Sequence, residues 1–548
     1  MRKSKGDRFF LITLFVIGFL ATFSYGAYLD QDSEQQILFS NIKEYLSNIP
    51  FYFELEQEFS DAGIIEISES IEKDHGIATY YLVFIVYYIN KISAYWGSVI
   101  WHLYTYCFIF LVGYNSLYLL LRKLFDSRKV AMFTVLVAFL TPRMFAECHY
   151  NNKDMILYAL LYALFYWGYC LIEQCSIRNA IIFAVYGAFA FNAKIIGAWF
   201  FGIIGIYVLV YFIVHKKWNK IIFRRTIICI GTWITTYIII TPACWNHIIA
   251  FFQYLFLYAV DFERWHNYIL FNGKLIHKEY TGIPHKYLPT IMLYTIPTGI
   301  LLLTVWGNII CLFDSIRSRF RQIFQTQGYV AVIAFAGIVP LAYAVISATP
   351  VYNGWRHFYF VYASMIIVVG YGVNRLLMLW NNKPLGKVLC YIGMAYLGIL
   401  AFTLLVNHPQ EHSYYNWLAG KKIEENFELD YWDMSIWQAY KLIEQDVQGE
   451  KNVSIGAFNL PTFWGLEVNY EVLPPSIQAR IKLEEEWQHA DYLIVNTTYA
   501  NIYNKELYEE VKEQYVLMDE IYSYGSVICE IYYVNNNSGQ ADFIVQQD

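Results

Sequence analysis

Three acidic residues lie within five positions directly after the first apolar stretch of the chain: Asp30, Asp32 and Glu34. A carboxylate at such a position can act as a general base on an acceptor hydroxyl, or it can bind a divalent cation. Asp32, or Ser33 beside it, can instead cap a helix running through 37–46, because carboxylates stabilise the first turn of a helix. The residues alone leave these roles open, so the metal ligands stay unknown and no cofactor is certain.

Basic residues follow in two further stretches that flank apolar segments, 141–154 and 350–357. Arg143, Lys153 and Arg356 supply the positive charge that recognition of a phosphate requires. The alternatives without a binding role are a solvated loop for the first stretch and an aromatic turn at the membrane interface for the second. Candidates for contacts with a substrate are Glu34 in the first acidic cluster and, in these two stretches, Glu147, His149, Asp154, Tyr352 and Trp355.

These candidates must be positioned by membrane-spanning helices. Of the 548 residues, 57% are hydrophobic and only 15% are charged, which excludes a disordered chain, a coiled coil and a typical cytosolic enzyme. A net charge of −6 argues against a nucleic-acid partner. Because a span needs about 20 apolar residues, hydropathy predicts about eleven transmembrane helices, near 9–29, 99–121, 130–146, 155–172, 179–192, 195–214, 226–241, 290–312, 328–347, 357–379 and 388–406.

Charge orients this arrangement. With the N-terminus in the cytoplasm, the predicted inner segments hold 20 Lys and Arg against four acids. The first outer loop, 30–98, holds three Lys and twelve acids, and the chain beyond 407 holds eight Lys and Arg against 24 acids. Since basic loops stay in the cytoplasm, we expect a multi-pass protein of the plasma membrane with an extracytoplasmic C-terminal domain. All the candidate clusters then lie on the outer side.

We therefore expect two domains, a transmembrane domain over 1–406 and a small extracytoplasmic α/β domain over 407–548. The segment 76–96 within the first outer loop is expected to lie on the membrane surface or to dip into it. In the second domain, alternating apolar residues and turn signals predict strands over 453–458 and 492–496, helices over 475–490 and 506–513, and a hairpin over 516–534.

The order of the motifs resembles the GT-C superfamily of polytopic glycosyltransferases, specifically the bacterial relatives of the protein O-mannosyltransferases and of the aminoarabinose transferase. The residues that carry the resemblance are Asp30 after the first span, TPRMFAECHYNNKD, FNGK with PHKYLP, YNGWRHFYF, and HPQEHSYYN with FELDYW. The resemblance implies a GT-C fold of about eleven transmembrane helices and a polyprenyl-phosphate-linked sugar donor, cleaved on the extracytoplasmic side with inversion.

The resemblance also implies roles for individual residues. Asp30 takes the position of the catalytic base, although members often have Asp-Glu where this chain has Asp30 and Gln31, which leaves Asp32 as an alternative. Glu147 and Asp154 are implied as supporting acids or as residues that orient the acceptor. The residues implied to bind the donor phosphate are Arg143, Lys153 and Arg356, with His357 and Lys194 as weaker candidates.

The expected function is transfer of a sugar from a polyprenyl-phosphate donor to an extracytoplasmic acceptor, which is a glycan, a lipid or a protein. The expected partners are the lipid-linked sugar, this acceptor and membrane lipids. No GxxxxGK[ST] or GxGxxG motif for a nucleotide occurs. The alternatives are a transporter or flippase of a lipid-linked glycan, which places polar groups near the bilayer midplane, and a non-catalytic envelope assembly protein.

Overall fold

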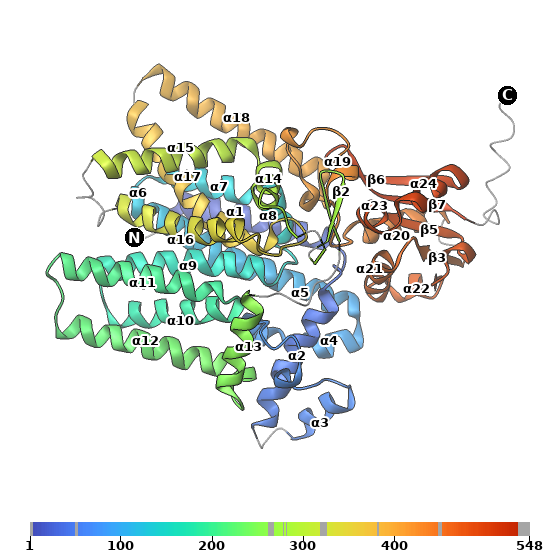
Figure 1. Ribbon diagram of the computed structural model, residues 1–548, viewed down its shortest axis with the longest axis horizontal. Coiled ribbons are helices and arrows are strands. Elements are labelled where there is room, and N and C mark those ends of the chain that lie inside the picture. Colours follow the sequence, from blue (N-terminus) through green and yellow to red (C-terminus); the bar gives the residue numbers. More distant parts are fainter. Residues whose placement is uncertain are drawn as a thin grey trace.

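The computed structural model describes residues 4–49, 53–260, 268–277, 279–280, 282–317, 326–380, 383–447 and 452–534. Within these residues, nine helical stretches are long and apolar enough to cross a membrane, and most lie side by side (Figure 1). They are formed by α1 (Lys5–Ala21), α5 (Ala94–Phe108) continued through a π-helical turn into α6 (Asn115–Phe125), α9 (Asp154–Glu173), α11 (Ile196–Val214), α12 (Lys220–Ile240), α15 (Thr298–Arg317), α16 (Thr326–Ile346), α17 (Tyr359–Trp380) and α18 (Pro384–Asn407). The chain is a multi-pass helical membrane protein, as its hydropathy predicts.

Nine of the eleven predicted stretches match these helices, whereas the other two, 130–146 and 179–192, form shorter helices. Prolines divide two of the predicted stretches. The stretch 130–146 is divided into α7 (Arg128–Phe139) and α8 (Pro142–Glu147). The stretch 290–312 is divided into α14 (Tyr287–Thr295) and α15, with Pro297 between them. Proline has no backbone N–H and is favoured at the start of a helix. A further helix, α10 (Ile177–Ala193), is apolar but shorter than the nine, and Lys194 separates it from α11 as expected.

Small residues let the central helices approach closely. A side chain at Gly113 would meet the Cα of Ala159 on α9 at 2.9 Å. A side chain at Gly197 would lie 2.1 Å from the carbonyl oxygen of Ala190. Close contact of this kind drives helix association in membranes, where apolar lipid offers no hydrophobic driving force. α9 and α17 are the most enclosed of the nine stretches, and the first turn of α9 carries the buried Asp154.

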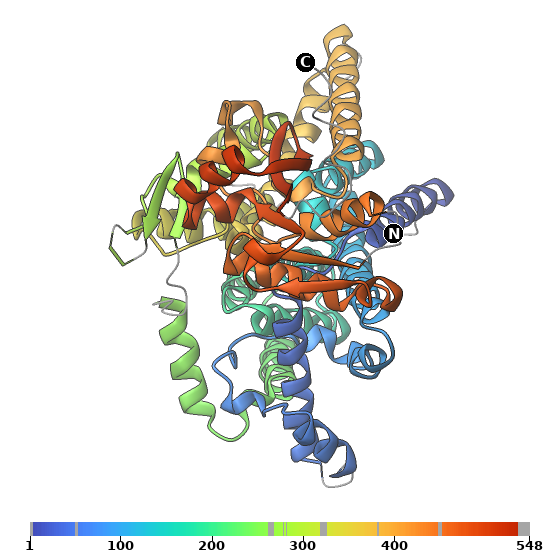
Figure 2. The same ribbon diagram turned by 90° about the vertical axis from the view of Figure 1, so that its right-hand side faces the viewer.

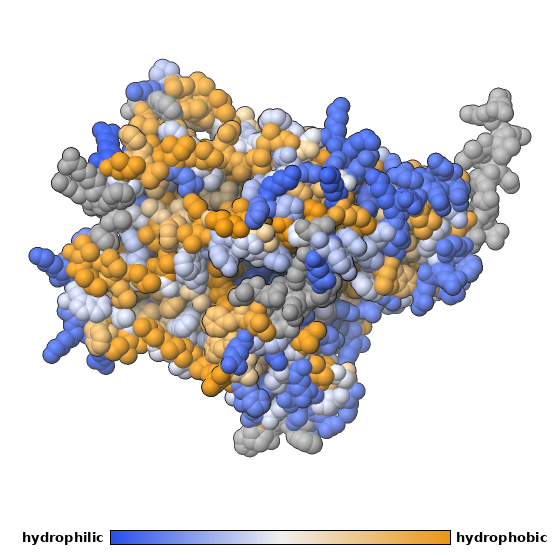
Figure 3. All heavy atoms as spheres, viewed as in Figure 1, coloured by the Kyte–Doolittle hydropathy of each residue, from blue (hydrophilic) through white to orange (hydrophobic). Residues whose placement is uncertain are grey.

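The two ends of the bundle differ in charge. At one end, loop charges are neutralised in pairs: Asp7 with Arg128 at 2.6 Å, and Asp314 with Arg375 at 2.8 Å. The opposite end carries the acidic first loop and the C-terminal domain (Figure 1). Figure 3 shows an apolar surface over the helices and a hydrophilic surface over the C-terminal domain, which is the distribution that a lipid environment around the helices requires.

The loops at the second end form short helices and one hairpin. The first loop contains α2 (Gln31–Ser47), α3 (Phe53–Asp61), a 3₁₀ turn at Ala78–Val83 and α4 (Val86–Ile92). The segment 76–96 is therefore a series of short turns rather than one long surface helix. Between α12 and α14 lie α13 (Ile248–Val260) and the antiparallel pair β1 (Tyr268–Phe271) and β2 (Lys274–His277).

The C-terminal domain is a five-stranded mixed sheet of order β4-β3-β5-β7-β6. Its strands are β3 (Val453–Ala457), β4 (Ile481–Glu484), β5 (Tyr492–Asn496), β6 (Val516–Ser523) and β7 (Ser526–Tyr533). Its helices are α19 (Ile423–Asn426), α20 (Ser435–Asp446), α21 (Leu460–Glu471), α22 (Pro475–Gln478), α23 (Thr497–Tyr503) and α24 (Lys505–Gln514). Both predicted strands and the hairpin are confirmed. The predicted helix over 475–490 is wrong beyond its first turn, because only α22 at its start is α-helical and the chain then forms the edge strand β4.

The domain is fixed to the end of the bundle through the chain between α18 and α20. Asp430 is fully buried and accepts hydrogen bonds from the backbone N–H groups of Met434 and Ser435 at 2.9 and 2.8 Å. The backbone N–H of Leu29, just before α2, donates to the carbonyl of Trp432 at 3.0 Å. Figure 2 shows the domain covering this end of the helices. The acidic first loop and the segment around Trp432 are therefore held against each other.

Candidate functional site

Asp30 occupies the N-cap position of α2, at the end of the bundle that the C-terminal domain covers. Its side chain makes no capping hydrogen bond to the helix. Instead, the carboxylate Oδ2 lies 3.6 Å from Nη1 of Arg356, which stands at the start of the α17 span. The Asp30 side chain is 42% exposed, whereas that of Arg356 is 9% exposed. A carboxylate open to an incoming acceptor therefore lies beside a nearly buried cation.

Glu34 lies one helical turn beyond Asp30 and is buried. Its Oε2 accepts a hydrogen bond from the Tyr28 phenol at 2.7 Å, and its Oε1 lies 3.6 Å from Nζ of Lys153. Burial raises the pKa of Glu34 to about 7, with Lys153 opposing the rise. The Lys153 ammonium also lies 3.0 Å from Nδ1 of His75 in the first loop. Glu34 is thus a carboxyl that can gain or lose a proton near neutral pH.

Asp154 and Lys194 form a second buried contact at the same bundle end. Asp154 begins α9, and Lys194 stands at the break between α10 and α11. The two side chains form an ion pair, and Asp154 Oδ2 also accepts a hydrogen bond from the Asn151 amide at 3.2 Å. Burial lowers the pKa of Lys194, and Asp154 opposes that change. Asp154 therefore holds the amine of Lys194 in place.

Aromatic rings fix the orientation of Arg356. Its guanidinium lies 4.5 Å from the Trp432 ring centre and 5.1 Å from that of Tyr352, distances at which cation–π attraction operates. The same Tyr352 ring packs against His357 at 4.8 Å. Among the described residues, Nε of Arg356 and Nε2 of His357 have no hydrogen-bond partner although both atoms are buried. Such donors mark a place where a polar ligand would complete the hydrogen bonding.

Arg143 lies on α8 and is only 1% exposed. Its Nη1 donates to the Tyr431 phenol at 3.1 Å, and that phenol donates to Oε1 of Glu147 at 3.0 Å. Oε1 of Glu147 also accepts from Tyr359 at 2.5 Å. Two further donors of Arg143, Nε and Nη2, have no hydrogen-bond partner in the described part of the chain. Arg143 is thus a buried cation with unused hydrogen-bonding capacity.

Glu428 and Tyr431 belong to the stretch FELDYW but are not among the site residues predicted from the sequence. Glu428 is 5% exposed, and burial raises its pKa to about 8 against the influence of Arg356 and Arg143. The pKa of the Tyr431 phenol is likewise raised by burial and by Glu147, and lowered by the same two arginines. The C-terminal segment therefore places an acid and a phenol between the two guanidinium groups. In the sequence, the only indication of this placement is the aromatic and acidic composition of the stretch FELDYW.

Several predicted site residues lie in the packing around the site. His149 is fully buried, with its ring stacked on Tyr106 at 4.9 Å and its Nε2 3.0 Å from the Gly18 carbonyl oxygen. Trp355 is 1% exposed and donates to the Thr295 hydroxyl at 2.7 Å. These polar atoms of His149 and Trp355 are engaged with protein partners in the packing, and a contact of either side chain with a substrate stays a prediction.

Asp32 differs from Asp30 in its surroundings. It is exposed and lies in the first turn of α2, near Glu471 on α21, whose pKa is raised mainly by burial and further by the charge of Asp32. No ion pair joins it to a cation in the described part of the chain, whereas Asp30 meets Arg356. It also does not cap the helix, since α2 begins at Gln31 with Asp30 in the N-cap position. The geometry therefore favours Asp30 over Asp32 as the acid of the site.

The spacing needed for a divalent cation is found, among the described residues, in the group Glu72, Asp74 and His75, whose ligand atoms lie within 4.8 Å of one another. Nδ1 of His75 is already 2.5 Å from Glu72 Oε2 and 3.0 Å from the Lys153 ammonium. A positive group at that distance opposes a metal ion by like-charge repulsion. The residues therefore fit a divalent cation poorly, and no step of the chemistry is assigned to one.

Two solved structures are similar to this chain: ArnT from Cupriavidus metallidurans in the apo state, and the same protein bound to undecaprenyl phosphate. Each is 12% identical, with a TM-score of 0.46, over 97% of this chain and 98% of that chain. No protein-family model and no curated protein matches the chain. Because the sequence identity is so low, the role of each residue in this chain is argued from the contacts that the residue itself makes.

Proposed function

We propose that the protein is a membrane glycosyltransferase that moves a sugar from a polyprenyl-phosphate-linked donor to an extracytoplasmic acceptor, with inversion at the anomeric carbon. The observation that carries the proposal is the contact of Asp30 with Arg356, at the same bundle end as Lys153 and Lys194. A solvent-accessible carboxylate beside buried cations is the combination that this transfer needs.

The reaction requires a base and a binding site for the leaving phosphate. The acceptor hydroxyl oxygen attacks the anomeric carbon of the sugar, and its proton passes to the Asp30 carboxylate. The bond between that carbon and the donor phosphate oxygen breaks, and its electron pair stays on the phosphate. Arg356 and Lys153 stabilise the negative charge that develops there. One displacement inverts the configuration, and the general base contributes roughly 10²–10⁴ in rate.

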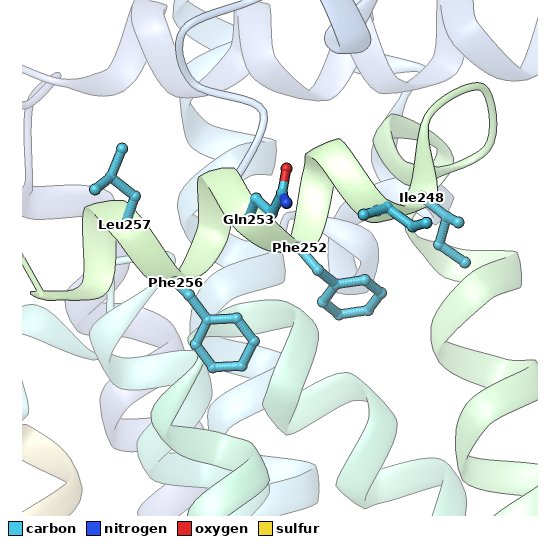
Figure 4. Close-up of a pocket in the computed structure, with 6 residues that line it drawn as sticks. Ile248, Phe252, Gln253, Phe256 and Leu257 are labelled. Atoms are coloured by element: carbon cyan, nitrogen blue, oxygen red, sulfur yellow. The ribbon is translucent and has the colours of Figure 1, made fainter.

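A lipid-linked donor is supported by an apolar groove along α13. Its volume is about 770 Å³, and its lining is almost wholly apolar. Figure 4 shows Phe252 and Phe256 extending to the same side of the helix. The lining residues are Ile248, Ile249, Phe252, Gln253, Phe256 and Leu257. We propose that the polyprenyl tail lies in this groove.

The groove is connected to the cations through the first loop. The Tyr254 phenol of α13 donates to the Ile71 carbonyl, and the Lys73 ammonium lies 4.5 Å from the Tyr254 ring centre. A few residues further, His75 contacts Lys153. A lipid with its tail along α13 would therefore extend its phosphate toward Lys153.

The orientation of the chain follows from charge. The end of the bundle with the basic loops is assigned to the cytoplasm, because positively charged loops remain there. The site, the acidic first loop and the C-terminal domain then lie outside the cell. Since the candidate cations gather at this one end, the arrangement favours chemistry at the membrane surface over transport through the bilayer, which would need polar groups near its midplane.

A binding and turnover experiment tests the proposal. The full-length protein in detergent is first titrated with undecaprenyl phosphate to measure binding. It is then incubated with each of a panel of undecaprenyl-phosphate-linked sugars, with cell-envelope glycans and lipids as acceptors, and the undecaprenyl phosphate that is released is measured. We expect Arg356→Gln to weaken binding at least tenfold, and Asp30→Asn to lower turnover at least about a hundredfold with an unchanged melting temperature. Glu69→Gln, which removes an exposed acid of the same loop, serves as the matched control. Failure of the wild-type protein to bind undecaprenyl phosphate, or near-normal turnover by Asp30→Asn, would overturn the proposal.

A further inference from the structure

Three basic residues at this end of the bundle are each paired with a carboxylate of the same site. Arg356 pairs with Asp30 and Lys153 pairs with Glu34, both at 3.6 Å, and Lys194 pairs with Asp154. In this state the groups that would bind a phosphate are neutralised by the acids of the site itself. A phosphate that enters must therefore compete with these carboxylates for the cations.

The pairs differ in how firmly the carboxylate is held. Asp154 is fixed by the Asn151 side chain as well as by Lys194. Glu34 accepts a hydrogen bond from Tyr28 through Oε2, the carboxylate oxygen that does not face Lys153. Asp30 makes no side-chain capping bond and is 42% exposed. If Arg356 is taken by another anion, the Asp30 carboxylate is the one that can turn to water without being left buried and unpaired.

A phosphate has a geometric advantage in this competition. The donor phosphate is a diester with one negative charge and two unbridged oxygens, whereas undecaprenyl phosphate is a monoester with more than one negative charge near neutral pH and three such oxygens. The guanidinium plane of Arg356 matches phosphate geometry and can form two parallel hydrogen bonds with it. The distance of 3.6 Å to Asp30 is longer than a charge-assisted hydrogen bond, and Nε of Arg356 is a buried donor without a partner in the described residues. A phosphate would accept hydrogen bonds from donors of Arg356 that the Asp30 carboxylate leaves without a partner.

We propose that Asp30 and Glu34 occupy Arg356 and Lys153 while no donor is bound, and that the donor phosphate displaces them, so that donor binding frees the Asp30 carboxylate to act as a base. This inference rests on the proposed function and adds an order of events to it. The acceptor hydroxyl is activated only after the donor has entered. Glu34 acts as a positioning residue, since it works through Lys153 and touches neither reacting atom.

The test uses undecaprenyl phosphate as the probe and the full-length protein in detergent. We expect Asp30→Asn and Glu34→Gln to bind the probe tighter than the wild-type protein does, by about tenfold each, because the competing charge is gone. A residue that merely maintained the structure would weaken binding when replaced. Glu69→Gln removes one exposed charge from the same loop and is expected to leave the affinity unchanged.

A double-mutant cycle separates displacement from general charge repulsion. If Asp30 competes for Arg356, the gain from Asp30→Asn disappears in an Arg356→Gln background, whereas simple repulsion of the phosphate by Asp30 would persist there. Glu34→Gln with Lys153→Gln provides the equivalent cycle if either Asp30 variant fails to fold. If the acid substitution no longer increases the affinity for undecaprenyl phosphate once its partner cation is replaced, the inference is supported. If it increases the affinity to the same extent there, the inference is overturned.

The outcomes also distinguish this inference from the function on which it rests. If Arg356→Gln and Lys153→Gln bind undecaprenyl phosphate as well as the wild-type protein does, the phosphate site itself is wrong. If these variants bind it weakly but Asp30→Asn and Glu34→Gln bind it no tighter than the wild-type protein, the phosphate site stands and the displacement is refuted.

Discussion

Nη1 of Arg143 on α8 receives its hydrogen-bond partner, the Tyr431 phenol at 3.1 Å, from the C-terminal segment beyond the last helix of the bundle. The same phenol donates to Glu147, so one hydroxyl joins the cation and the acid of α8. The candidate site is therefore built by both parts of the chain. A role for the C-terminal segment in completing the site follows from this contact, whatever the rest of that domain binds.

Removal of this hydroxyl should destabilise the junction. In Tyr431→Phe, Arg143 loses a partner in a buried position, and a lost buried hydrogen bond with an unsatisfied group costs about 1–3 kcal/mol. We expect a lower melting temperature in detergent, measured by tryptophan fluorescence, together with weaker binding of undecaprenyl phosphate. Tyr280→Phe, at an 81% exposed position, is the control that should change neither. An unaltered melting temperature for Tyr431→Phe would contradict the bridging role.

Glu34 predicts a dependence of stability on pH. Its pKa is raised from 4.5 to about 7 in the folded chain. The folded state therefore holds this proton more tightly than the unfolded state does, and the contribution of Glu34 to stability is lost as the pH rises from 4.5 to 7. The loss amounts to no more than about 3.5 kcal/mol. Glu34→Gln should remove this part of the pH dependence, as measured by melting temperatures between pH 5 and pH 8, while Glu69→Gln should retain it.

The pair of Lys194 and Asp154 predicts a large loss when one partner is removed. Lys194→Met leaves the carboxylate of Asp154, whose side chain is 7% exposed, buried without its cation. Breaking a buried pair in this way costs about 3–5 kcal/mol. We expect a marked fall in melting temperature and in the yield of folded protein. The double variant Lys194→Met with Asp154→Asn should recover part of the loss, since no uncompensated charge remains; a double variant less stable than Lys194→Met would contradict the pairing argument.

The groove along α13 predicts an effect that depends on the lipid tail. Phe256 is 59% exposed and lines the groove. Because burial of a Phe side chain is worth about 1.5–3 kcal/mol, Phe256→Ser should weaken binding of undecaprenyl phosphate by roughly tenfold or more. A phosphate with a short prenyl tail should bind both proteins alike, because it does not reach the groove. Equal weakening for the long and the short lipid would place the tail elsewhere.

Much of the fold could be predicted from the sequence because hydropathy and charge act locally. Apolar length identified most of the spans, and Lys194 marked a true break between helices. The same reasoning missed the division at Pro142, since the apolar composition continues across it. It also took 475–490 for a helix, where pairing with β3 converts part of the segment into the edge strand β4. Pairing between distant strands has no signal within the segment itself.

The candidate site shows the same division between local and distant information. Asp30, Arg143, Lys153 and Arg356 could be named from the sequence, because charges next to apolar segments are costly and so are conspicuous. By itself the sequence determined a multi-pass membrane protein with unequal ends and a short set of charged candidates. Only the tertiary structure decided that Asp30 rather than Asp32 meets Arg356, that His149 is committed to packing, and which acid neutralises each cation. Those outcomes depend on which helix ends come together, and contacts between distant segments leave no trace in the composition of either one.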